Sequence, residues 1–301
     1  MTDYKECRLC PRNCGIDRKT KTGYCNEKST LHVSRAALHM WEEPCISGIR
    51  GSGTVFFSGC NMGCVFCQNR TISKGEVGKY ISQKRLVEIF FELKNKGANN
   101  INLVTGDMFI PTISKAVEEA KLQNLGIPFL MNTSSYINVD SLKQLEGLID
   151  IYLPDFKYIR DKDAVKYSNA HGYVKAAKDA IDEMVRQQPA CIFEDDDQGQ
   201  HLIKKGVIVR HLLMPGMLIQ AKLIVNYLHE RYTDSIYISL MNQYTPNKNL
   251  NEYPEIDRKV SQREYKSLVD HAIKLGIINA YVQEGDTAQE SFIPEFDLSG
   301  V

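Results

Sequence analysis

The sequence shows no excess of positive or negative charge. Its 301 residues include 37 Lys and Arg against 37 Asp and Glu, so the formal net charge is zero. Proteins that bind nucleic acid or anionic membranes by long-range attraction carry a strongly basic surface. We therefore expect neither nucleic acid nor a membrane surface as a partner.

Long apolar runs are also missing. The first ten residues, MTDYKECRLC, are polar and lack the apolar stretch of a secretory signal. No run approaches the roughly 20 apolar residues that span a bilayer. We therefore expect a cytosolic protein, whose nine cysteines exist under reducing conditions. Clustered thiols in that setting bind metal or carry redox chemistry more often than they form disulfides.

From Thr54 onward, short apolar runs alternate with amphipathic stretches. Seven runs resemble buried strands, at residues 54–59, 100–106, 127–133, 149–155, 206–216, 235–244 and 278–285. Amphipathic helical patterns lie between them, for example at residues 82–97, 110–126 and 261–276. This alternation predicts right-handed βαβ crossovers and a parallel sheet. Six or seven such units fit a closed or partly open (β/α) barrel of the α/β class.

Three segments are expected along the chain. Residues 1–45 form a Cys-rich, metal-binding N-terminal segment, residues 46–285 the barrel, and residues 286–301 a C-terminal tail. The acidic run at residues 194–201 is interpreted as a solvated hairpin turn rather than a site for a hard cation.

Polar residues follow the predicted strands, where the chemistry of a (β/α) barrel is found. Strand ends are polar in any barrel, because loops begin there, but this explains poorly three thiols in one loop or the run Asp-Phe-Lys at residues 155–157. The residues concerned are Cys60, Asp107, Asn132, Asp155, Lys157, Arg210, His211, Gln243, Gln283 and Glu284.

Three cysteines, Cys60, Cys64 and Cys67, lie within eight residues and have no fourth beside them. Closed zinc and ferredoxin sites take four protein ligands. Three thiolates can hold three irons of a four-iron cluster and leave the fourth iron open for a small molecule. A zinc site completed by a distant ligand is the alternative, although zinc sites more often use spaced cysteine pairs.

The spacing Cys-x3-Cys-x2-Cys, with Phe66 before the last cysteine, resembles the radical S-adenosylmethionine (SAM) superfamily. Much of the remaining chain resembles homologues of pyruvate formate-lyase activating enzyme, within a group of iron–sulfur proteins that carry an N-terminal four-cysteine segment. The motifs that carry this resemblance are CRLCPRNCGIDR, EEPCISGIRGSGTVFFSGCNMGCVFCQN, IYLPDFKY, GVIVRHLLMPG, SLMNQYTP and FIPEFD. The resemblance implies a partial (β/α)6 barrel.

The resemblance also implies a chemistry. The amino and carboxylate groups of SAM would chelate the open iron of a [4Fe–4S] cluster, and one electron would split SAM into methionine and a hydrogen-abstracting 5′-deoxyadenosyl radical. It implies a flavodoxin or ferredoxin as reductant and a protein substrate, either a glycyl radical enzyme or another peptide. Radical modification of a small molecule, and a non-catalytic iron–sulfur electron-transfer or sensor protein, remain as alternatives.

The resemblance supplies candidate SAM contacts where motifs match. Asp155 and Lys157 match an Asp-x-Lys motif, although Lys157 could instead form an internal ion pair with Asp155, and Arg210 matches an arginine that contacts SAM. Activating enzymes have Gly-Gly-Glu where this chain has VTGDMF, so Asp107 either accepts from the SAM ammonium or caps a helix. Asn132 stands in NTSSY, where activating enzymes have an Asp-Thr-Asn-Gly-like turn.

A second set of four thiols precedes the first strand. This set consists of Cys7, Cys10, Cys14 and Cys25, and four thiols can complete a metal site without any further ligand. The sequence does not decide whether that site holds zinc or a second iron–sulfur cluster. His211 either contacts adenine or is a satisfied core histidine.

Overall fold

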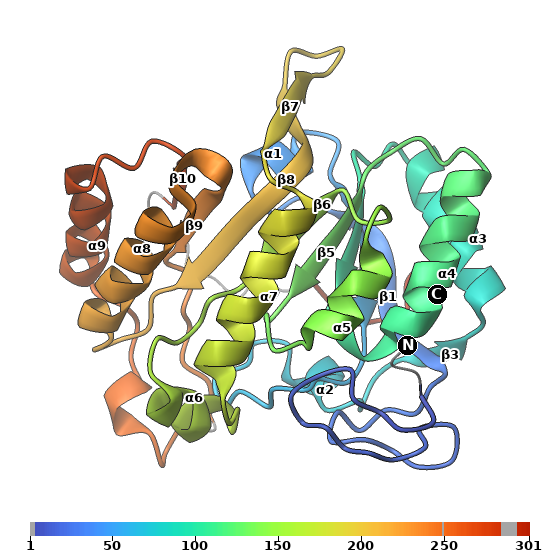
Figure 1. The fold of residues 1–301 in the computed structure, drawn as a ribbon, viewed down its shortest axis with the longest axis horizontal. Coiled ribbons are helices and arrows are strands. Elements are labelled where there is room, and N and C mark those ends of the chain that lie inside the picture. Colours follow the sequence, from blue (N-terminus) through green and yellow to red (C-terminus); the bar gives the residue numbers. More distant parts are fainter. Residues whose placement is uncertain (1–3, 249, 284–293) are drawn as a thin grey trace.

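A mixed α/β architecture is seen in the computed structural model, which describes residues 4–248, 250–283 and 294–301 (Figure 1). Ten strands form one sheet in the order β10-β9-β8-β6-β5-β4-β2-β1-β3, with β7 paired to β8 beside it. Their bounds are β1 Leu31–His39, β2 Ser52–Phe57, β3 Lys79–Ile81, β4 Ile101–Val104, β5 Phe129–Thr133, β6 Ile151–Pro154, β7 Ile192–Asp195, β8 His201–Leu212, β9 Tyr237–Met241 and β10 Ala280–Val282.

The seven predicted strands are all present, as β2, β4, β5, β6, β8, β9 and β10. Each pairs in parallel with its neighbour in the sheet. Their residues are mostly buried, which explains why they appear in the sequence as continuous apolar runs rather than alternating ones. The path of the sheet ends at β10 and β3, so the described strands form an open, partial barrel, as predicted.

The longer helices α3, α4, α7, α8 and α9 cover one face of the sheet, whereas α2 and α6 lie near the carboxyl ends of its strands (Figure 1). Two predicted helix starts are confirmed in detail: the Ser82 side chain accepts from the Arg85 backbone, and Ser261 and Glu264 form a capping box. Phe90 of α3 packs edge-on against Phe129 of β5, with ring centroids 5.1 Å apart. The helices are α1 Pro44–Ser47, α2 Arg70–Ser73, α3 Gln83–Asn95, α4 Ile110–Leu122, α5 Val139–Leu142, α6 Asp161–Ser168, α7 Tyr173–Gln187, α8 Leu218–Tyr232 and α9 Gln262–Lys274.

Short 3₁₀ turns cover residues Asp107–Phe109, Lys143–Leu145, Thr233–Ser235 and Pro254–Ile256. In the described ranges, we find no helix with the length and apolar character needed to cross a bilayer.

The N-terminal region contributes to the sheet as well as to the cysteine-rich segment. Strand β1 pairs antiparallel with β2 and with β3. Residues before β1 fold beneath the sheet, near α2 and the carboxyl ends of the central strands (Figure 1, dark blue). The cysteine-rich segment therefore lies on the side of the sheet where a (β/α) fold places its chemistry.

The acidic run forms the predicted hairpin turn. Strands β7 and β8 pair antiparallel across it, and the hairpin projects from the body of the protein (Figure 1). Asp196 accepts from the backbone N–H groups of Gln198 and Gln200, which is the ordinary behaviour of an aspartate in a turn.

Candidate functional site

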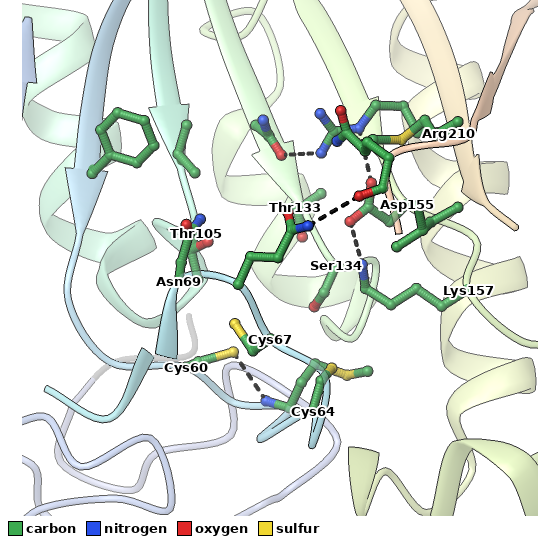
Figure 2. Close-up of a pocket in the computed structure, with 18 of the residues that line it drawn as sticks. Cys60, Cys64, Cys67, Asn69, Thr105, Thr133, Ser134, Asp155, Lys157 and Arg210 are labelled. Carbon is green, nitrogen blue, oxygen red and sulfur yellow. Dashed lines mark hydrogen bonds and ion pairs between the residues drawn. The ribbon is translucent and has the colours of Figure 1, made fainter. Parts of the chain in front are cut away.

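A cavity of about 260 Å³ opens at the carboxyl ends of the central strands. Its walls come from the loop after β2 and from the ends of β4, β5, β6, β8 and β9, so chain segments far apart in sequence meet there. The predicted residues that line it are Cys60, Cys64, Cys67, Asn132, Asp155, Lys157, Arg210 and Gln243. We call it the main cavity (Figure 2).

The three-cysteine loop, residues 60–67, forms one end of the main cavity. Its sulfur atoms are grouped there in Figure 2. Two of them already accept hydrogen bonds: the Met62 backbone N–H lies 3.4 Å from Cys60 Sγ, and the Ser168 hydroxyl lies 2.9 Å from Cys64 Sγ. Hydrogen bonds of this kind stabilise a thiolate ligand and tune an iron–sulfur cluster.

The chemistry of these thiols fits a bound cluster. Desolvation raises the pKa of Cys60 and of Cys64 to about 11, so their thiolates need a cationic partner at neutral pH. Among the described residues, no group of three or more His, Cys, Asp or Glu is arranged to hold a single metal ion. Three cysteines that line one open cavity suit a cluster whose fourth iron takes its ligand from that cavity.

A charged network faces the three-cysteine loop across the main cavity (Figure 2). Asp155 accepts from Lys157 Nζ at 2.5 Å and from Arg210 Nε at 2.8 Å. The guanidinium also donates from Nη2 to Asn132 Oδ1 at 2.7 Å. Parallel pairing brings these residues together, because Asp155 and Arg210 form a β-bridge beyond the end of β6.

The network keeps Asp155 and Lys157 charged. Burial acts to raise the pKa of Asp155, but Arg210 and Lys157 outweigh it, and this pKa lies below its ordinary value. Burial likewise disfavours the charged form of Lys157, yet the Asp155 carboxylate holds the Lys157 pKa above its ordinary value. The internal ion pair that the sequence left open for Lys157 is therefore present.

Glu42 belongs to this network and was not anticipated. Its carboxylate accepts from Arg210 Nη1 at 3.2 Å, from Asn102 at 3.0 Å and from Asn132 at 3.4 Å. Its side chain is only 9% exposed, and burial raises its pKa. Glu42 lies between β1 and α1, so it follows none of the predicted strands. The sequence feature that could have indicated Glu42 is the pair of acidic residues at 42–43, which directly precedes an apolar turn.

Asp107 does not line the main cavity. It lies at the wall of a smaller cavity with Cys7, Cys10, Cys14 and Cys25. Neither carboxylate oxygen has a hydrogen-bond partner among the described residues, so the side chain makes no capping hydrogen bond there. Desolvation raises its pKa to about 7.

Other predicted strand-end residues are also placed by the structure. His211 is buried and its Nδ1 lies 2.8 Å from the Phe156 carbonyl oxygen, so it is a core histidine rather than part of the cavity wall. Burial lowers its pKa to about 4. The Gln283 side chain accepts from the Asn242 backbone N–H instead of facing the main cavity. Glu284 lies outside the described residues.

Comparison with known proteins gives a family and a fold. Residues 54–193 match the family profile described as the radical SAM superfamily. An uncharacterized protein from Methanocaldococcus jannaschii is 27% identical over 281 residues, which cover 91% of this chain and 76% of that protein.

Two solved structures share the fold. The FeFe-hydrogenase maturase HydG from Carboxydothermus hydrogenoformans has a TM-score of 0.52 and 15% identity, covering 78% of this chain and 54% of that one. SuiB from Streptococcus suis, bound to S-adenosylmethionine, has a TM-score of 0.50 and 15% identity, covering 76% of this chain and 49% of that one. The chain thus spans about half the length of these two structures. Residues 54–193 thus form a radical SAM domain, and members of that superfamily are generally enzymes that use a four-iron cluster and SAM.

Proposed function

We propose that this protein is a radical SAM enzyme whose cluster is held by Cys60, Cys64 and Cys67. The observation that carries the proposal is the position of these thiols, which face the charged network across one cavity. When bound and reduced, such a cluster supplies the electron that splits SAM into methionine and a 5′-deoxyadenosyl radical.

The charged network matches the groups of SAM. Lys157 has three donors, of which Asp155 takes one, so its ammonium can also pair with the methionine carboxylate. Arg210 supports the same carboxylate from β8, while Asp155 and Asn132 offer acceptors to the ribose hydroxyls. Asp107 lines the smaller cavity and not the main one, but it interacts electrostatically with Cys60 and Asp155 of the main cavity, so it stays our candidate for the SAM ammonium.

The substrate we propose is a loop of a partner protein, with a glycyl radical enzyme as the leading candidate. The main cavity formed by the described residues, about 260 Å³, is already below the roughly 300–1,000 Å³ of typical small-molecule sites. The cluster and SAM would share this space, so a substrate that reaches in from outside fits better than a second enclosed small molecule. Gln243 on the wall and the exposed Trp41 beside it offer polar and aromatic contacts to such a segment.

Two further assignments complete the proposal. A flavodoxin or ferredoxin supplies the electron, and the four N-terminal cysteines bind a metal centre, either zinc or a second cluster.

The proposal is tested by anaerobic reduction in the presence of SAM. We expect the wild-type protein to release 5′-deoxyadenosine, and the triple variant Cys60→Ala, Cys64→Ala, Cys67→Ala to release none. The control is Cys191→Ala, because Cys191 lies outside both cysteine sets and should leave the reaction unchanged. Product formation by the triple variant would overturn the cluster assignment.

The substrate class needs a separate experiment. Reduced protein, SAM and a candidate glycyl radical enzyme are mixed anaerobically, and electron paramagnetic resonance is used to look for a glycyl doublet. Absence of the doublet, together with deuterium transfer into 5′-deoxyadenosine from a labelled small molecule, would move the substrate to the small-molecule class.

A further inference from the structure

Two buried hydroxyl groups lie behind the three-cysteine loop. The Tyr158 hydroxyl oxygen is 2.7 Å from Ser168 Oγ, and Ser168 Oγ is 2.9 Å from Cys64 Sγ. Both hydroxyl-bearing residues are 0% exposed, and neither lines the main cavity. We call Tyr158 and Ser168 the hydroxyl pair. The pair therefore reaches Cys64 from the protein interior and not from the space where SAM would bind.

The position of Tyr158 follows from the segment that leaves β6. Side chains of an extended chain point alternately to opposite sides. Asp155 and Lys157 line the main cavity, whereas Phe156 and Tyr158 are buried in the core. The Tyr158 ring meets the Tyr173 ring edge-on, with centroids 5.4 Å apart and an angle of 83°. This packing fixes the ring, and with it the direction of the hydroxyl.

The position of Ser168 follows from the end of α6, of which it is the last residue. The Val65 N–H donates to the Tyr167 carbonyl oxygen at 2.9 Å, and Arg12 Nη1 donates to the Asn169 carbonyl oxygen at 2.6 Å. The same guanidinium donates to two backbone carbonyl oxygens of the three-cysteine loop, at 2.9 and 3.0 Å. The loop is thus held to the helix end on both sides of Ser168, which fixes the separation of Ser168 from Cys64.

The number of protons decides the direction of the two hydrogen bonds. A hydroxyl group has one proton to donate and can also accept. A cysteine that binds a cluster is a thiolate, so its sulfur can only accept. Ser168 must therefore give its one proton to Cys64 Sγ. Its oxygen is left as an acceptor, and Tyr158 becomes the donor to it.

Tyr158 is suited to be a permanent donor. Burial and the nearby Cys64 raise the pKa of Tyr158 well above its ordinary value, so the phenol keeps its proton at neutral pH. Within the described ranges, no hydrogen-bond partner of this hydroxyl other than Ser168 is found. A proton given to Ser168 is therefore the hydrogen bond that satisfies this buried hydroxyl.

The donor from Tyr158 also orients the Ser168 hydroxyl. A serine in a helix can turn its proton back to the carbonyl oxygen one turn earlier. A donor that occupies the serine oxygen from the tyrosine side leaves the serine proton to point away from it, toward Cys64. Consecutive hydrogen bonds also polarise one another, which strengthens each by roughly 10–30%.

We propose that Tyr158 is a positioning residue that acts through the Ser168 hydroxyl to direct a hydrogen bond onto Cys64 Sγ, and that it thereby raises the reduction potential of the bound cluster. The proposal rests on the proposed function, because it requires a cluster at the three-cysteine loop. Hydrogen bonds to the sulfurs are one of the factors that set cluster potentials. Such a bond stabilises the reduced state more, because the reduced cluster carries more negative charge.

Cys64 is the cysteine on which these effects concentrate. Its bond from Ser168, at 2.9 Å, is shorter than the 3.4 Å bond from the Met62 N–H to Cys60 Sγ. The positive charge of Lys157 also acts to lower the pKa of Cys64, although burial outweighs it. Two neighbouring residues after β6 thus act on one sulfur, Lys157 by charge and Tyr158 by a hydrogen bond.

The proposal is tested by the midpoint potential of the reconstituted cluster. Anaerobic redox titration without SAM, followed by electron paramagnetic resonance, is applied to the wild type, Tyr158→Phe, Ser168→Ala and the double variant. We expect Tyr158→Phe to shift the potential to a more negative value, by less than Ser168→Ala does. The double variant should match Ser168→Ala alone, because Tyr158 acts through Ser168. A wild-type potential in Tyr158→Phe, or additive shifts in the double variant, would overturn the proposal.

The matched control is Tyr152→Phe. Tyr152 is also 0% exposed, and the substitution also removes one hydrogen bond, to Gln187 Oε1 at 2.5 Å. Tyr152 does not line the main cavity, so the potential should stay at the wild-type value. A shift in this control as large as that in Tyr158→Phe would show a general effect of losing a buried hydroxyl and would contradict the proposal.

A second substitution covers the case in which Tyr158→Phe does not assemble a cluster. 3-Fluorotyrosine in place of Tyr158 keeps the ring and the hydroxyl, but its hydroxyl is more acidic and donates a stronger hydrogen bond. We expect the potential to move to a more positive value, opposite to the shift in Tyr158→Phe. An unshifted or more negative potential would refute the role of Tyr158.

Iron and sulfide are counted in each protein before its titration, which separates the two levels of the argument. A wild-type protein that binds no iron would overturn the proposed function, and this inference with it. A fully loaded cluster whose potential does not respond to position 158 would overturn this inference alone.

Discussion

Replacing Asp155 by Asn removes the central charge of the network in the main cavity. Asp155 accepts from Lys157 Nζ at 2.5 Å and from Arg210 Nε at 2.8 Å. The asparagine has the same shape, but it retains a single side-chain acceptor. Its NH₂ group would then face a cation, so one of the two charge-assisted contacts is lost and the other is weakened.

The size of the effect follows from the burial of the three side chains. Asp155 and Lys157 are each 17% exposed and Arg210 is 11% exposed, so solvent screens the network little. Removing one partner from a buried ion pair costs about 3–5 kcal/mol. We expect Asp155→Asn to lie near the lower end, at about 3 kcal/mol, because Glu42 still pairs with Arg210. Loss of the orientation of Lys157 should also weaken SAM binding about tenfold, which corresponds to about 1.4 kcal/mol.

Two anaerobic assays measure these quantities. Urea unfolding followed by circular dichroism gives the change in stability, and calorimetric titration with SAM gives the change in Kd. The matched control is Asp182→Asn, since Asp182 also holds an arginine, Arg231, but is 37% exposed and lies on α7. It should lose at most about 1 kcal/mol and bind SAM normally. A variant Asp155→Asn with wild-type stability and wild-type SAM affinity would refute the account of this network.

Three further predictions concern single side chains. Glu264→Gln should lower the unfolding free energy by about 1–2 kcal/mol at neutral pH. The reason is that hydrogen bonds from Arg258 hold the Glu264 pKa well below its ordinary value. Urea unfolding should show the full difference above about pH 4.3, and the difference should disappear as the pH falls through the lower pKa of the folded protein. Glu42→Gln should weaken SAM binding in the same titration, since its amide would face the guanidinium, and unchanged affinity would exclude Glu42 from the site. Ser168→Ala should move the cluster potential to a more negative value in a redox titration, because Cys64 Sγ loses its hydrogen bond; an unshifted potential would show that Cys64 is not a ligand.

The parallel strands and the three-cysteine loop were predictable because their signals are local. Strands buried on both faces appear as apolar runs, and the spacing of Cys60, Cys64 and Cys67 is visible without a structure. Strand β1 was not predicted, because Ser34 and Arg35 interrupt its apolar pattern. Ser34 is buried by donating to the Phe56 carbonyl oxygen, a contact that exists only in the folded sheet.

Side-chain direction after a strand was not predictable. Asp107 follows β4 as expected, but Thr105, with φ of +57°, turns the chain just before it. Asp107 consequently lines the smaller cavity, with the four N-terminal cysteines, rather than the main one. Glu42 was missed for a related reason, since its partners Asn102, Asn132 and Arg210 come from three separate strands.

The central claim is that SAM binds the iron that the three cysteines leave open. Its most direct test is electron–nuclear double resonance on the reduced protein, with SAM that carries ¹⁵N at its amino group. If Cys60, Cys64 and Cys67 leave one iron for SAM, the spectrum should show hyperfine coupling between that nitrogen and the cluster. The ¹⁵N coupling should be absent from a matched sample prepared with unlabelled SAM. A fully loaded, reduced cluster that shows no coupling to the labelled nitrogen would contradict the claim that SAM is the fourth ligand.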